Sequence, residues 1–304
     1  MPPDLNDLTD SISLTPYQAL GIPIALIGAV FLALGAQFQS TGVSKVEARS
    51  GVAASGGLNL TQLLALVKRP SWVIGTLMLG LAIVLQLVSL GIAPLIVVQP
   101  LGAVALVITA IVNSRVTKTA LDRRSIRAIV ICVGGVGLFV IFAAIYAKET
   151  PIDNGQLITI LIILAAVIAL FGAAFAFLRS RFKAIAYILG AGVLYGFVAT
   201  LAKVVIVRIK TGDVEFLTML CIVALLAAAA FGAYFVQTAY SSGPPDLVIA
   251  GLTVIDPLVA VGIGVIVLGE AAGAPPFAIL AFVVSAAIAI FGVFQLAKFH
   301  PQIR

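Results

Sequence analysis

The chain has 304 residues, of which 62% are hydrophobic and 10% are charged, with 18 Lys and Arg against 12 Asp and Glu. A soluble domain contains about 45–50% apolar and about 25% charged residues, so this composition excludes a soluble globular protein. The single histidine, His300, excludes histidine-ligated metal enzymes and histidine-based triads. Cys132 and Cys221 both lie in apolar runs, as buried packing residues do. We therefore expect a multi-pass membrane protein with an all-α helical bundle.

Nine stretches are long and apolar enough to cross about 30 Å of hydrocarbon, which takes about 20 helical residues. In chain order they are residues 17–41, 70–92, 93–114, 125–147, 155–178, 184–207, 214–240, 245–268 and 275–297. The first is too long for a signal-peptide core, and the acids Asp4, Asp7 and Asp10 precede it, so it counts as a span. Residues 60–67 are apolar but too few to cross, and we expect them at the membrane interface.

The basic residues predict the orientation. Fourteen Lys and Arg residues flank the connections after the first, third and fifth spans or lie in the C-terminal tail, whereas Lys148, Arg208 and Lys210 lie on the other side. The side richer in Lys and Arg is normally cytoplasmic. We expect residues 1–16 to be an extracytoplasmic tail and residues 298–304 a cytoplasmic tail, in the cell (plasma) membrane. In such a protein the basic excess reports orientation, so the expected partner is the lipid bilayer and no nucleic acid.

A short pattern occurs in both halves of the chain. The third span contains Gln99-Pro100-Leu101 and the eighth contains Asp256-Pro257-Leu258; Gly137 follows Pro100 by 37 residues, and Gly292 follows Pro257 by 35. We interpret residues 17–147 as a first four-helix repeat, 148–183 as a linking fifth helix and 184–297 as a second repeat. An offset of five helices reverses the direction of each equivalent helix, and such an inverted-topology repeat is typical of secondary transporters.

The same segments carry a family resemblance. The stretch from Ala93 to Ala103, APLIVVQPLGA, resembles the NIPA-like magnesium transporters, and residues 239–270, which contain Pro257 and end in Leu-Gly-Glu at Glu270, resemble the EamA repeat. Both groups belong to the drug/metabolite transporter (DMT) superfamily, and the resemblance extends over most of the chain. Before the fourth span the sequence is Lys-Thr-Ala-Leu, where such repeats often carry Glu. The resemblance implies magnesium or another divalent cation as one candidate solute.

Asp256 is the most informative polar residue. At about 1.5 Å per residue it lies about 16 Å into the eighth span, near the midplane. A carboxylate there costs about 2.5–3.5 kcal/mol, so it is expected to face a cavity or a partner. Pro257 removes a backbone donor beside it, and Pro100 and Pro257 are the expected helix breaks. Asp256 is thus a candidate cation or proton site, and the metal ligand if the solute is a divalent cation; a protonated Asp256 bonded to a neighbouring helix is the alternative.

The other candidate substrate-binding residues are Gln99, Gln37, Gln86 and Lys203. The amides could equally form hydrogen bonds between helices. Lys203 lies near the outer end of the sixth span, where it can snorkel to the surface, form a salt bridge or contact an anionic solute. Glu270 is expected at the interface with a structural role. Two glycine series are expected to pack helices closely: Gly21, Gly28 and Gly35 in the first span, and Gly192 and Gly196 in the sixth.

The sequence contains no HExxH, CxxC, GxSxG or phosphate-binding glycine motif, so we expect no enzyme and no cofactor. We expect a secondary transporter that moves a small polar, amphipathic or lipid-linked metabolite by alternating access between the two repeats. The alternative solute is magnesium or another divalent cation. A membrane scaffold subunit that transports nothing is the further alternative.

Overall fold

The computed structural model describes residues 14–50, 67–117, 122–178, 184–242 and 245–299. Within these ranges all regular structure is helical, and nine helices are long and apolar enough to span a membrane, so the predicted nine-span all-α bundle is confirmed. Most of both terminal tails and most of the segment 60–67 lie outside the described residues. The helices are α2 (Pro16–Ala19), α3 (Gly21–Ser50), α5 (Pro70–Leu90), α6 (Leu95–Val98), the 3₁₀ helix η1 (Gln99–Leu101), α7 (Gly102–Thr117), α8 (Arg123–Tyr146), α9 (Asn154–Leu178), α10 (Ala184–Thr211), α11 (Phe216–Ser242), α12 (Pro245–Ile266) and α13 (Pro276–Phe299).

Local sequence explains where these helices begin and end. Thr15 caps α2 through a capping box with Gln18, and α3 then continues to Ser50, nine residues beyond the predicted end of the first span. The third span consists of α6, η1 and α7, and a turn separates it from α5. That turn ends at Pro94, which has no N–H with which to continue α5 and adopts an extended conformation before α6.

The two prolines act differently. Pro100 lies in η1, where the backbone changes from α-helical to 3₁₀ geometry. Pro257, in contrast, lies inside α12, which runs unbroken from Pro245 to Ile266. The expected helix break is therefore wrong at Pro257. A single missing N–H removes one hydrogen bond, and the packing of α12 on its neighbours holds the rest of the helix.

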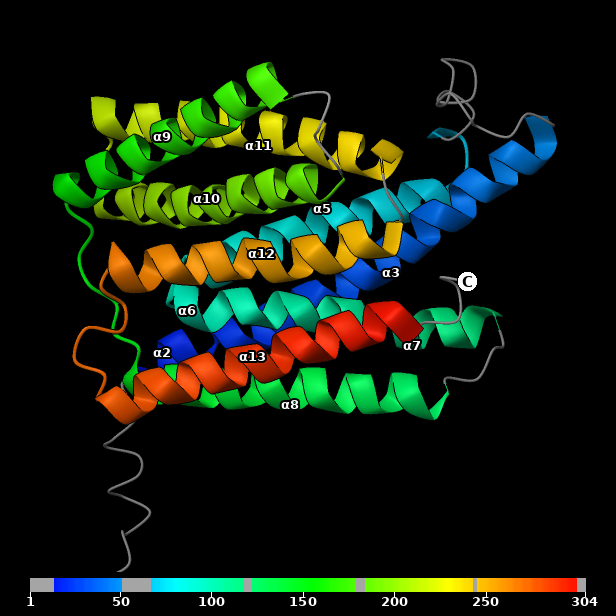
Figure 1. The fold of residues 1–304 in the computed structure, drawn as a ribbon, viewed down its shortest axis with the longest axis horizontal. Coiled ribbons are helices and arrows are strands. Elements are labelled where there is room, and N and C mark those ends of the chain that lie inside the picture. The colour runs from blue at the N-terminus through cyan, green and yellow to red at the C-terminus, as the bar shows by residue number, and fades with distance from the viewer. Residues whose placement is uncertain (1–13, 51–66, 118–121, 179–183, 243–244, 300–304) are drawn as a thin grey trace, which may run out of the picture.

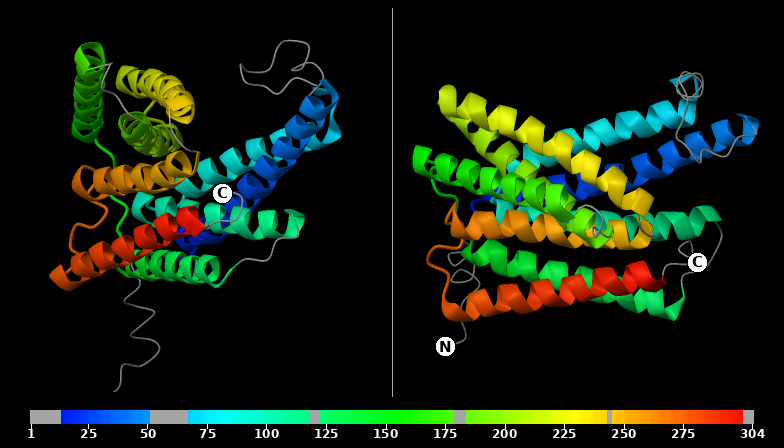
Figure 2. Two further views of the ribbon diagram at one scale, coloured as in Figure 1. Left: turned by 45° about the vertical axis from the view of Figure 1, so that its right-hand side comes forward. Right: turned by 45° about the horizontal axis from the view of Figure 1, so that its top comes forward.

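The long helices pack in sets that the expected repeat would make equivalent. In the first half α3 packs on α5 and α7, and in the second half α10 packs on α11 and α12. Helices α8 and α13 pack on each other across the two halves, as Figures 1 and 2 show, while α9 lies at the edge of the bundle and packs on α10 and α11.

Glycines allow the closest of these approaches. A Cβ atom on Gly192 would lie 2.6 Å from Ile255 Cβ, and one on Gly196 would lie 2.6 Å from Val259 Cβ, so these glycines bring α10 against α12. The first-span glycines act similarly, because a Cβ on Gly35 would lie 3.0 Å from the Gly75 carbonyl oxygen of α5. Both glycine series therefore lie at helix–helix contacts.

The contact of α8 with α13 is reciprocal and corrects one part of the predicted repeat. A Cβ on Gly135 would lie 2.8 Å from Ala289 Cα, and one on Gly292 would lie 2.6 Å from Cys132 Cα, whereas a Cβ on Gly137 would meet nothing within 4 Å. Gly135, and not Gly137, is thus the glycine that fits the expected repeat as the counterpart of Gly292. Gln99 and Asp256, Pro100 and Pro257, and Gly135 and Gly292 are then all separated by the same 157 residues.

The two ends of the bundle differ. At one end, which we call the Glu149 end, the α5–α6 turn, the α8–α9 connection, the C-terminus of α10 and the α12–α13 connection come together. Toward the opposite end, α3 and α5 diverge from α7, α8 and α13, as Figures 1 and 2 show.

We predict that Gly135→Ala destabilises the protein by about 1–3 kcal/mol, because the new methyl group meets the backbone of α13, which cannot rotate away. Gly137→Ala in the same helix is the matched control and should be neutral or slightly stabilising, since its Cβ enters open space. Thermal unfolding of the purified protein in detergent measures both. Equal melting temperatures for the two variants would contradict the reciprocal contact.

Candidate functional site

A cavity of about 740 Å³ lies between α3, α5, η1, α7, α10 and α12. Three of the predicted substrate-binding residues, Gln86, Gln99 and Asp256, line it together with Pro257. Tyr195 of α10 and Thr253 of α12 add two polar side chains that sequence reasoning missed. The position of Tyr195 between Gly192 and Gly196 could have indicated it, because that stretch of α10 is the one that approaches α12.

Asp256 lies at the middle of α12 and faces this cavity. Its Oδ1 atom is buried and has no hydrogen-bond partner among the described residues. The neighbouring backbone is held against α10, since a Cβ on Gly196 would lie 3.0 Å from the Asp256 carbonyl oxygen. A buried polar atom without a partner costs free energy, so Asp256 beside the cavity carries an acceptor that the described residues leave unsatisfied.

The other polar groups of the cavity also keep hydrogen-bonding capacity. No bond from the side chains of Gln86, Gln99 or Tyr195 to another described residue is formed, whereas the Thr253 hydroxyl donates to the Ile249 carbonyl at 2.8 Å. The remaining wall is apolar and is formed by Ala, Gly, Leu, Ile and Pro residues. An apolar cavity with a few converging polar groups is the usual form of a small-molecule site.

Gln37 and Lys203 do not line the cavity. Gln37 is half-buried on α3, where its backbone carbonyl accepts a hydrogen bond from Thr41. Lys203 is 1% exposed and therefore does not snorkel to the surface; of the interpretations left open by the sequence, the salt bridge is the one formed. It lies eight residues after Tyr195, about 12 Å along α10 toward the Glu149 end.

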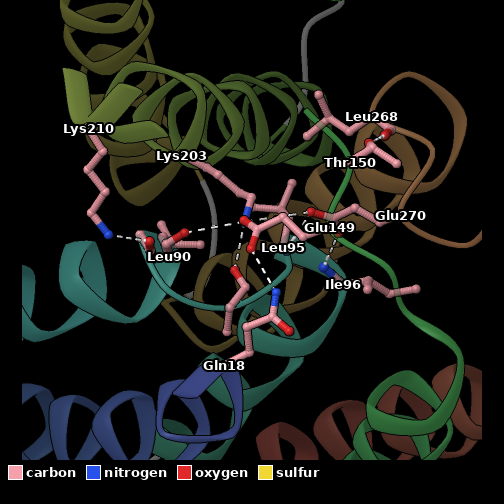
Figure 3. Close-up of polar contacts among 12 residues, drawn as sticks. Gln18, Leu90, Leu95, Ile96, Glu149, Thr150, Lys203, Lys210, Leu268 and Glu270 are labelled. Carbon is pink, nitrogen blue, oxygen red and sulfur yellow. Dashed lines mark hydrogen bonds and ion pairs between the residues drawn. The ribbon is translucent and has the colours of Figure 1, made fainter. Parts of the chain in front are cut away.

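Lys203 is the centre of a buried polar cluster that Figure 3 shows. Its ammonium group donates to the carbonyl oxygens of Ala93 at 2.7 Å and Leu90 at 3.4 Å, both in or beside the α5–α6 turn. It also forms an ion pair with Glu149 at 2.7 Å and lies 3.9 Å from Glu270. The Lys203 ammonium group thus provides hydrogen-bond donors to carbonyl groups that lie where α5 ends, beyond the reach of further helical N–H groups.

Glu270 holds the other side of the same turn. Its two carboxylate oxygens accept hydrogen bonds from the backbone N–H groups of Leu95 and Ile96, each at 2.7 Å, at the start of α6. Within the protein its side chain is fully buried, with 1% of the residue exposed. A carboxylate at a helix N-terminus bonds the unpaired N–H groups and opposes the positive end of the helix dipole. Its role is structural, as predicted, but inside the bundle.

Glu149 completes the cluster and is also missed by sequence reasoning. It is the most accessible member, with 28% of its side chain exposed, and it accepts a hydrogen bond from Gln18 at 3.0 Å. Burial raises the pKa of its carboxyl, but the Lys203 charge and the hydrogen bonds from Lys203 and Gln18 outweigh burial and hold the pKa below its ordinary 4.5. The sequence signal that could have identified Glu149 is its position directly after an apolar span, in a short connection.

Comparison with known proteins shows a similarity of low identity. The chain is 26% identical over 216 residues to a protein of Corynebacterium glutamicum whose name is "uncharacterized protein", and the match covers 71% of this chain and 75% of that protein. No family model matches the chain. No solved structure matches it either. The fold and the cavity therefore carry the functional argument.

We predict that Lys203→Met destabilises the protein strongly, by about 3–5 kcal/mol, since it leaves buried Glu270 without its cation and the turn carbonyls without a donor. Glu149→Gln should cost clearly less, because Glu149 is partly exposed and the amide still accepts a bond from Lys203. Chemical unfolding in mild detergent measures the free energy of unfolding of the two variants and ranks them. A Lys203→Met protein as stable as wild type would show that the cluster does not hold the turn.

We also predict acid sensitivity from Glu149. A carboxyl with a lowered folded pKa contributes stability that is fully present above its ordinary pKa of 4.5 and is lost as the pH falls through the folded value. The melting temperature of wild type should therefore fall faster below pH 4.5 than that of Glu149→Gln. The difference between the two pH profiles is the readout, and parallel profiles would contradict the ion pair.

Proposed function

We propose that the protein is a secondary transporter of the DMT type that moves a small solute across the cell membrane by alternating access. The observation that carries this proposal is the cavity, which lies between the proposed halves and is lined by Asp256, whose buried Oδ1 has no hydrogen-bond partner among the described residues. Intramembrane ionisable residues usually mark solute or ion pathways. A carboxylate facing a cavity of solute size fits that use.

The proposed repeat supports the same function. Gln99 and Asp256 are separated by the offset that relates Gly135 to Gly292, so residues at equivalent positions of the two halves face one cavity. Transporters built from inverted repeats bind solute at the repeat interface and expose it to each side by moving one repeat against the other. We accordingly propose the division into residues 17–147, 148–183 and 184–297.

The Lys203 cluster is the proposed gate of the Glu149 end. It joins α10 and Glu270 of the second half to the α5–α6 turn of the first half, with Glu149 from the connection between the halves. Opening the cavity toward this end requires these contacts to separate. We therefore propose a structure closed at the Glu149 end, which the positive-inside rule assigns to the extracytoplasmic side with an outside N-terminus.

The proposed solute is a small polar, amphipathic or lipid-linked metabolite. Magnesium remains the alternative that the family resemblance suggests. Magnesium is held by oxygen ligands, commonly one or two carboxylates with several retained waters, and Asp256 is the single acidic residue among the described residues that line the cavity. Among the described residues no group of three or more His, Cys, Asp and Glu side chains could hold a metal. A scaffold that transports nothing is the remaining alternative.

Site accessibility tests the mechanism without knowledge of the solute. We predict that Thr253→Cys, in the cavity wall, reacts with a membrane-impermeant maleimide faster in inside-out than in right-side-out vesicles. Adding Lys203→Met should raise labelling from the extracytoplasmic side several-fold, because the gate contacts are lost. Native Cys132 and Cys221 are buried, and labelling of the protein that carries these two cysteines alone gives the background rate. Val283→Cys, on the exposed face of α13, is the lipid-facing control.

Labelling of Thr253→Cys from one face only, unchanged by Lys203→Met, would contradict alternating access and favour the scaffold. Labelling no faster than Val283→Cys from either face would exclude a water-filled pathway.

For magnesium we predict no influx above that of empty liposomes when the purified protein is reconstituted with an entrapped magnesium-sensitive dye under an imposed gradient. Influx that is lost in Asp256→Asn would instead establish the divalent-cation alternative and place Asp256 on its path.

A further inference from the structure

The charge balance around the cavity favours a cation. Among the described residues that line it, Asp256 is the single charged one and none is Lys, Arg or His. The nearest described charged cluster along α10, formed by Lys203, Glu149 and Glu270, has one cation and two carboxylates when all three are ionised. An anionic solute would find no basic partner among the described residues of the wall, whereas a cation would pair with the carboxylate of Asp256, which lines the cavity.

The polar groups match an ammonium group better than a bare metal ion. An ammonium is a donor of up to three hydrogen bonds and accepts none. The cavity offers the Asp256 carboxylate and the amide oxygens of Gln86 and Gln99 as acceptors, and the Tyr195 ring as a surface for a cation–π contact. A magnesium ion would have to keep most of its water shell beside apolar walls, which provide no further oxygen ligands.

The remaining wall selects an apolar body. On α3 and α5 it is formed by Ala25, Ala29, Leu32, Ala82 and Leu87, and on α12 by Ile249 and Leu252. The volume of about 740 Å³ lies within the range of about 300–1,000 Å³ that is typical of small-molecule sites. The site therefore has room for a ring or a branched chain besides the cationic group.

We propose that the solute of this cavity is an organic amine, a monocation with an apolar body, whose ammonium group pairs with Asp256 and whose body packs on α3, α5 and α12. This inference rests on the proposed transport function and names its substrate class. In this proposal one positive charge is bound by two side chains: the carboxylate of Asp256 in the second half and the neutral amide of Gln99 at the equivalent position of the first half.

The test is direct binding of radiolabelled phenethylamine to the purified protein by scintillation proximity. We expect saturable binding to wild type, and competition by unlabelled phenethylamine but not by 2-phenylethanol or 3-phenylpropionate, which keep the ring and replace the ammonium by a hydroxyl or a carboxylate. Asp256→Asn should lower the affinity at least about tenfold, because a charge-assisted hydrogen bond is lost. Asp256→Glu, which keeps the charge, should bind more tightly than Asp256→Asn.

No saturable binding to wild type, equal binding by Asp256→Asn, or equal competition by the alcohol or the acid would overturn the amine. If Asp256→Asn does not fold, the three competitors on wild type decide. The maleimide experiment separates this inference from the transport proposal: alternating accessibility without amine binding refutes the substrate class alone, and amine binding without alternating accessibility refutes transport.

Discussion

The turn between α5 and α6 imposes the constraint on which the structure depends. Ala93, Leu95 and Ile96 are at 0% exposure, so the backbone groups here that the adjoining helices do not bond cannot turn to water. The protein meets this requirement with two charges of opposite sign: Lys203 bonds the carbonyl groups, and Glu270 bonds the N–H groups. Because the two side chains come from the other half of the chain, satisfying the turn also joins the halves.

The same contacts position the candidate site. They fix the start of α6 against α10 and α12, and Gln99 follows four residues after Leu95, at the first turn that reaches the cavity. Gly192 and Gly196 then bring α10 to the turn of α12 that carries Asp256. An ion-pair cluster at one end and a glycine contact near mid-span thus hold the walls between which the cavity lies. A clamp made of a few polar bonds, unlike a broad apolar interface, can separate without exposing much apolar surface.

Much of the fold was predictable, since spans follow from apolar length and the bilayer is a strict solvent. The depth of Asp256 followed from counting residues, and its position in a cavity wall agrees with that count. Contacts between distant segments were not predictable: Glu149 and Lys203 are 54 residues apart, and nothing in either neighbourhood indicates the other. The choice of Gly137 failed for a geometric reason, because two residues rotate about 200° around a helix and face away from the contact that Gly135 makes.

The sequence difference between the halves matters as much as their likeness. At equivalent positions of the Pro-Leu pattern the first half has Gln99 and the second has Asp256, and both side chains line one cavity. Two carboxylates there would repel each other unless a divalent ion or a proton lay between them. One carboxylate and one amide instead balance a single positive charge. When no cation is bound, the two side chains do not repel each other. For the proposed transporter, this difference between the proposed halves therefore favours a monovalent cation as the solute over a divalent metal.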